Sequence, residues 1–84
     1  MIYLNGEFMP LAEAKISVMD RGFLFGDGVY EVVPVYSRRP FRLAEHLTRL
    51  QRSLAGIRME NPLTSEEWSA LIGKIIESAD CDDQ

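Results

Sequence analysis

The 84 residues are enough for one domain or part of one, and 46% of them are hydrophobic and 26% are charged. A chain of this size buries only about 60–65% of its unfolded surface, so we expect modest stability. No apolar run approaches the ~18 residues of a membrane helix, Met1–Leu4 is too short for a signal peptide, and the lone Cys81 excludes an internal disulfide; we therefore predict a soluble, cytoplasmic protein.

Charge is unevenly distributed along the chain. The formal net charge is −4, yet residues 38–58 contain six arginines against the single acidic residue Glu45, which gives this segment +5. Because the guanidinium group suits phosphate or carboxylate, the segment predicts an anion site, with a solvated helix face as the alternative. The acidic chain, without interleaved basic and aromatic residues, disfavours nucleic-acid binding.

The first predicted element is a β-hairpin. Residues 2–4 and 7–9 flank Asn5-Gly6, the strongest two-residue hairpin signal, because both turn positions require a positive φ. A helical turn over 11–14 and an extended stretch over 16–18 follow. Phe23–Phe25 forms an apolar block between glycines, and Gly26-Asp27-Gly28 is expected to bend the chain.

Residues 29–36 predict the clearest strand, because six of the eight are β-formers. Pro34 cannot donate a ladder hydrogen bond, so this strand should lie at an edge or bulge. Alternation places Tyr30 and Val32 on one face with Pro34 and Tyr36. The opposite face takes Val29, Glu31, Val33 and Val35. Ser37–Arg39 should turn the chain into a short strand at 40–41, which completes a second hairpin.

Two amphipathic helices are predicted after the hairpins. Apolar residues recur at spacings of four and three in the stripe Leu43, Leu47, Leu50, Leu54 and Ile57, and Pro62 blocks any continuation. Thr64 and Glu67 form a capping box for a second helix that runs to Ala79. The order hairpin, hairpin, helix, helix predicts an α+β fold, with an antiparallel sheet from the two β-hairpins packed against two C-terminal helices.

Helical geometry singles out one polar flank of the first helix. His46, Ser53 and Arg49 lie together beside the apolar stripe. Arg49 could be fixed at the border of the core and point its guanidinium into a cleft, or could extend along the surface into solvent. For His46 we expect a hydrogen-bonded packing histidine, because no second histidine supports a metal site or a catalytic triad. Tyr30 could donate into a pocket or serve as a core aromatic.

The segment from residue 20 to residue 50 resembles a known family. Two stretches are similar to the N-terminal signature of class IV (fold type IV) pyridoxal-phosphate enzymes. They are Asp20-Arg21-Gly22-Phe23-Leu24-Phe25-Gly26-Asp27-Gly28-Val29-Tyr30-Glu31-Val32 and Glu45-His46-Leu47-Thr48-Arg49-Leu50. The similarity covers residues 1–79. Tyr30 with Glu31-Val32 is most similar to aminotransferases of the D-amino-acid type.

The resemblance implies roles for three residues. Arg49 would bind the phosphate of pyridoxal 5'-phosphate, Tyr30 would face the substrate carboxylate, and Val32 would line the same face. It also implies a homodimer that transfers an amino group between a D-amino acid and a 2-oxo acid, D-alanine and 2-oxoglutarate giving pyruvate and D-glutamate.

The resemblance further implies that residues 1–84 are a partial N-terminal domain. The family's cofactor-binding lysine belongs to a C-terminal domain, and neither Lys15 nor Lys74 is placed to replace it, so we expect the 84-residue chain to be inactive alone. Three alternatives stay open: a branched-chain aminotransferase fragment, an aminodeoxychorismate lyase fragment, and a stand-alone binding or dimerisation module.

Overall fold

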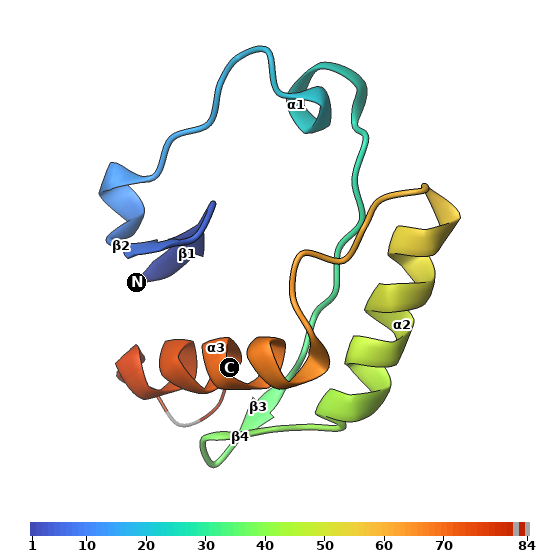
Figure 1. Ribbon diagram of the computed structural model, residues 1–84. Helices are drawn as coiled ribbons and strands as arrows, with labels where there is room; N and C mark the ends of the chain where they lie inside the picture. The colour runs from blue at the N-terminus through green and yellow to red at the C-terminus, as the bar shows by residue number, and fades with distance from the viewer. Residues whose placement is uncertain (82, 84) are drawn as a thin grey trace.

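A computed structural model describes residues 1–81 and 83 (Figure 1). Its elements, in chain order, are β1 (Ile2–Leu4), β2 (Glu7–Met9), the 3-10 turn η1 (Leu11–Glu13), α1 (Arg21–Phe25), β3 (Val35–Tyr36), β4 (Arg39–Pro40), α2 (Leu43–Gly56) and α3 (Ser65–Ser78). The predicted α+β class, with two antiparallel hairpins followed by two longer helices, is confirmed.

The β1–β2 hairpin forms where Asn5-Gly6 predicts it. Asn5 and Gly6 have φ of 50° and 90°, and Ile2 pairs with Met9. The rings of Tyr3 and Phe8 pack edge to face with centroids 5.0 Å apart across the two strands. The turn chemistry and one aromatic pair therefore explain this hairpin locally.

The two hairpins form separate two-stranded sheets in the described part of the chain, instead of the single sheet expected. The predicted strand over 29–36 was too long, because only Val35 and Tyr36 pair, with Pro40 and Arg39. The return strand was predicted at 40–41 and lies at 39–40. Pro34 offers no N–H, and no described segment lies alongside 29–33 to accept a ladder, so these residues stay extended but unpaired.

The short helix α1 replaces the apolar block expected at Phe23–Phe25. The Asp20 carboxylate accepts from the Gly22 N–H at 2.9 Å, which caps the first turn. Gly26 ends the helix with a left-handed φ of 68°, and its N–H donates to the Arg21 carbonyl. The Asp before and the Gly after were the helix signals in the sequence.

The β3–β4 hairpin contacts the end of α3 through Arg38. Ser37 and Arg38 have φ of 48° and 62°, a turn with two left-handed residues and no glycine. Arg38 Nη2 donates to the carbonyl of Ala79 at 3.0 Å, and Arg38 Nη1 to that of Ile76 at 3.4 Å. The Ala79 carbonyl lies at the helix end, where intrahelical donors run out, whereas the Ile76 carbonyl also accepts from the Ala79 N–H at 3.1 Å. Figure 1 shows this hairpin beside α3.

The helices α2 and α3 carry three of the four buried hydrophobic side chains of the described residues. The capping box at the start of α3 is confirmed, with Thr64 Oγ1 accepting from the Glu67 N–H at 3.1 Å and Glu67 accepting from the Thr64 N–H at 2.9 Å. Trp68 Nε1 donates to Asn61 Oδ1 at 2.7 Å, which fixes the loop between the helices. The predicted apolar stripe faces inward at Leu47 and Leu54, which are buried, but its last member, Ile57, lies beyond the helix and is exposed.

The hydrophobic core is small. The buried side chains among the described residues are those of Val35, Leu47, Leu54 and Ile76. The radius of gyration is 13.8 Å, whereas a compact domain of this length has about 12 Å. No helix in the described residues is long and apolar enough to cross a membrane. The fold thus buries a helical half well and leaves the connection from residue 14 to residue 34 open (Figure 1).

Candidate functional site around Glu31, His46 and Arg49

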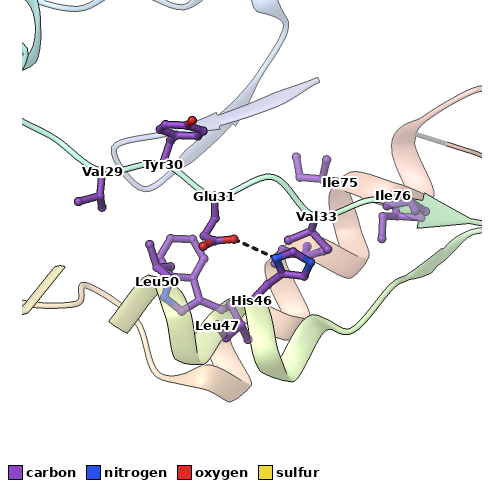
Figure 2. A pocket seen from close by; sticks show the side chains of 12 residues that line it. Val29, Tyr30, Glu31, Val33, His46, Leu47, Leu50, Ile75 and Ile76 are labelled. Atoms are coloured by element: carbon purple, nitrogen blue, oxygen red, sulfur yellow. Dashed lines mark hydrogen bonds and ion pairs between the residues drawn. The ribbon is translucent and has the colours of Figure 1, made fainter. Parts of the chain in front are cut away.

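A carboxylate, an imidazole and a guanidinium meet where the extended segment passes α2. The segment alternates as predicted: Val29, Glu31, Val33 and Val35 are half-buried or buried, and Tyr30 and Val32 are exposed. Figure 2 shows Tyr30 and Glu31 on opposite sides of the chain, with Glu31 directed at His46. The period of two in the backbone thus turns the acidic side chain toward the helix.

Glu31 accepts hydrogen bonds from both partners on α2. Arg49 Nη2 donates to Oε2 at 2.9 Å, and Arg49 Nε donates to Oε1, which makes a two-point contact. His46 Nδ1 lies 2.9 Å from Oε2. Since an ionised carboxylate only accepts, the Nδ1 atom must carry the proton in this contact. The packing histidine expected from the sequence is confirmed as a hydrogen-bonded one.

These contacts stabilise the ionised form of Glu31. The hydrogen bond from Arg49, followed by that from His46, lowers the pKa of Glu31 from 4.5 to about 2, against an opposing effect of burial. The same hydrogen bond raises the pKa of the Arg49 guanidinium above its usual value. The carboxylate therefore stays charged across the whole physiological range.

The three side chains differ sharply in exposure. The side chains of Glu31 and His46 are 11% and 17% exposed, whereas that of Arg49 is 61% exposed. Arg49 thus combines the two alternatives left open by its helical position. Its Nε edge is fixed against the core border by a carboxylate, and the remainder of the guanidinium reaches solvent.

Tyr30 and Val32 lie on the outer face of the same segment. Tyr30 is 86% exposed and Val32 is 66% exposed. The interpretation of Tyr30 as a core aromatic was therefore wrong, since the inner face is occupied by Val29 and Glu31. Both outward side chains are available to a ligand or to further protein.

A cavity of about 450 Å³ lies on the inner side, between the extended segment, α2 and α3 (Figure 2). Its walls are mostly apolar, and the residues that line it are Val29, Tyr30, Glu31, Val33, Val35, His46, Leu47, Leu50, Trp68, Ile72, Ile75 and Ile76. Glu31 and His46 hydrogen-bond each other there, which leaves few polar groups to orient a ligand. The cavity therefore resembles an incompletely filled core more than a binding pocket.

The described part of the chain offers little support for a metal site or a catalytic lysine. No group of three or more metal-ligating side chains comes together there. Lys74 lies with Nζ 5.6 Å from the centre of the Phe8 ring, and Lys15 is exposed near β1 and β2. Both lysines are exposed, whereas a lysine that forms a covalent intermediate is desolvated by its surroundings.

Glu31 is the site residue that sequence reasoning missed. The alternation pattern had already placed this carboxylate on an otherwise apolar inner face. An acidic residue in that position requires a cationic or hydrogen-bonding partner, because a buried charge without one is costly. The arginine-rich helix that follows was the available source.

A family model and individual relatives both show that this chain is similar to aminotransferases. The family model described as amino-transferase class IV matches residues 28–83. A D-alanine aminotransferase of Staphylococcus aureus (strain N315) is 42% identical over 76 residues, and one of Staphylococcus haemolyticus is 37% identical over 75 residues. These stretches cover 90% and 89% of the chain and 27% of each relative.

A third relative has a different name. A provisionally named branched-chain-amino-acid aminotransferase of Methanocaldococcus jannaschii is 47% identical over 66 residues, which are 79% of the chain and 23% of that protein. The chain thus spans about a quarter of the length of the curated relatives that it matches.

Proposed function

The chain belongs to the class IV aminotransferases, and we propose that it forms the N-terminal part of a pyridoxal-phosphate enzyme that transfers the amino group of D-alanine to 2-oxoglutarate. The relatives named D-alanine aminotransferase, which align over nine-tenths of the chain, support this substrate. The observation that carries the cofactor assignment is the orientation of Arg49. Its guanidinium is held on one edge and open on the other.

The residues present fit the phosphate end of this cofactor. An arginine uses five N–H donors, and Glu31 occupies only the Nε side and part of Nη2. The Nη1 hydrogens have no hydrogen-bond partner among residues 1–81 and 83, and they suit a phosphate dianion. When bound, pyridoxal phosphate supplies an aldehyde that links to the substrate amine and a ring that withdraws electrons from its Cα.

Tyr30 and Val32 form the substrate side of the proposal. Their shared outward face supports a role for the Tyr30 phenol as a donor to the substrate carboxylate and for Val32 as the adjacent wall.

By this proposal, residues 1–84 alone have no transaminase activity. Lys15 and Lys74 are both exposed, so neither fits the lysine that the cofactor requires. Incubation with pyridoxal phosphate followed by borohydride should leave both lysines unlabelled by mass spectrometry. Stoichiometric labelling of either one, with transaminase turnover, would disprove this part.

The substrate is tested in the complete polypeptide that contains residues 1–84. Pyruvate should form from D-alanine and 2-oxoglutarate at least tenfold faster than L-leucine is consumed under the same conditions. Preference for L-leucine would instead establish the second candidate, a branched-chain aminotransferase. That candidate is favoured by the relative that is 47% identical over 66 residues.

We also propose self-association as a homodimer, in line with the apolar side chains that the connection exposes. Phe23, Phe25 and Val18 are each more than 65% exposed in the isolated chain, and such a surface favours contact with further protein. Sedimentation of the complete polypeptide measures this directly, and a monomer at micromolar concentration would exclude it. A stand-alone dimerisation module would instead dimerise without any transaminase activity.

A further inference from the structure

Glu31 is placed to determine where the Arg49 guanidinium points. Arg49 projects from α2 with most of its side chain in solvent, so its own packing fixes it weakly. The Glu31 carboxylate is held by its hydrogen bond to His46, and only a small part of the Glu31 side chain is exposed to solvent. A rigid carboxylate that accepts from both Nε and Nη2 defines the plane and the direction of the guanidinium.

His46 and Arg49 reach the same carboxylate because they lie about one helical turn apart on α2. His46 Nδ1 and Arg49 Nη2 both lie 2.9 Å from Glu31 Oε2. The contact of 3.4 Å between Nη2 and Nδ1 is a consequence of this sharing, since both atoms carry protons. The imidazole thus limits the freedom of the acceptor, and the acceptor limits the freedom of the arginine.

We propose that Glu31 is a positioning residue for phosphate binding: it holds Arg49 so that the Nη1 edge of the guanidinium faces the cofactor phosphate. His46 in turn holds the carboxylate of Glu31 in place. This inference rests on the proposed function, in which Arg49 binds that phosphate. It assigns a role to the two least exposed members of the cluster, neither of which touches the ligand.

Removal of Glu31 should change the affinity for phosphate in the direction opposite to the one that charge repulsion alone predicts. A carboxylate beside an anion site repels the anion, so its removal should tighten phosphate binding if charge alone matters. If Glu31 acts by orienting Arg49, its removal should weaken binding despite the lost negative charge. Removing the partner that orients a ligand-binding side chain costs about tenfold or more in affinity in comparable metal sites.

The experiment measures dissociation constants in the complete polypeptide that contains residues 1–84. Pyridoxal phosphate and pyridoxal are titrated against the wild type, Glu31→Gln, His46→Ala, His46→Asn and Glu45→Gln. Glu45→Gln is the matched control, because it removes the same charge from an exposed residue of α2 that pairs with Arg42. Pyridoxal lacks the phosphate, so its affinity reports whether the rest of the site and the fold stay intact.

Four results together support the inference. Glu31→Gln weakens pyridoxal phosphate about tenfold and leaves pyridoxal unchanged. Glu45→Gln leaves both affinities within about twofold of the wild type. His46→Ala weakens pyridoxal phosphate about threefold. His46→Asn, whose amide can donate from near the Nδ1 position, restores most of that loss, which a general structural defect would not do.

Two other results overturn it, and they do so differently. Unchanged or tighter binding of pyridoxal phosphate by Glu31→Gln refutes the positioning role and leaves the proposed function standing. An equal loss of pyridoxal affinity refutes it as well, because the effect is then not directed at the phosphate. Arg49→Ala tests the premise: if it leaves the preference for pyridoxal phosphate over pyridoxal intact, the phosphate role of Arg49 fails with everything built on it.

Discussion

The segment from residue 35 to residue 79 and the connection from residue 10 to residue 34 differ in how their apolar residues are used. The first segment contains all four buried side chains of the described residues. The second contains nine of their fifteen exposed large hydrophobic residues. Both have clear apolar patterns, so the pattern alone does not bury a residue. Burial requires a partner element, which α2 and α3 supply to each other and the connection lacks.

The Glu31 cluster lies at the boundary between these two regions. Glu31 belongs to the extended end of the connection, and His46 and Arg49 belong to α2. The carboxylate is therefore one of the few points where the open region is bound to the packed one.

Truncation of a core leucine should have the largest effect. Leu54 is 5% exposed on α2, so Leu54→Ala should destabilise the chain by about 2–3 kcal/mol. Phe23 is 68% exposed in α1, so Phe23→Ala should change stability by less than about 0.5 kcal/mol. Urea denaturation followed by circular dichroism measures both. Equal losses would show that the connection is packed in solution.

Removal of the α3 cap should have an intermediate effect. Thr64→Ala deletes the side-chain acceptor for the Glu67 N–H and should cost about 1 kcal/mol. Ser69→Ala is the matched control, because its hydroxyl bonds a carbonyl within the helix and alanine is the better helix former. A loss from Ser69→Ala as large as that from Thr64→Ala would argue against the capping box as the source of stability.

A substitution in the β3–β4 turn should raise the stability of the chain instead of lowering it. Ser37 has φ of 48°, a left-handed conformation that glycine adopts without steric cost. Ser37→Gly should therefore stabilise the chain by about 0.5 kcal/mol, net of the entropy that glycine adds to the unfolded state. Ser53→Gly, inside α2, should destabilise it by a similar amount. Thermal unfolding compares the two, and a loss at both positions would contradict the prediction.

Acidification should have the smallest effect, because Arg49 is largely exposed and solvent screens its pairing. The pKa of Glu31 is lowered from 4.5 to about 2, so its contribution to stability is present above pH 4.5 and is lost as the pH falls toward 2. The difference in urea midpoint between the wild type and Glu31→Gln should shrink as the pH falls from 4.5 toward 2. Parallel profiles down to pH 2 would contradict this shift.

Local signals made much of the fold predictable. Asn5-Gly6, the leucine spacing of α2 and the Thr64–Glu67 box each determine an element through neighbouring residues, and each was confirmed. The extent of β3 was not predictable in this way, because a strand requires a partner that no local pattern guarantees. The helix α1 was missed because its five residues carry little periodicity between their two caps.

The candidate site was predictable only in part. The helical spacing brought His46 and Arg49 to one flank, and the alternation of 29–35 turned Glu31 inward. The meeting of the two faces depends on how the extended segment crosses α2, which is a tertiary property. The roles of Tyr30 and Val32 stay predictions, since they depend on a ligand.

The contact between Arg38 and the end of α3 has a consequence for synthesis on the ribosome. Arg38 and its acceptor at Ala79 are 41 residues apart. At about 5–20 residues per second, the hairpin tip is made roughly 2–8 s before that carbonyl exists. Until then Arg38 cannot make this hydrogen bond, so the end of α3 completes a contact of the hairpin that precedes it in the chain.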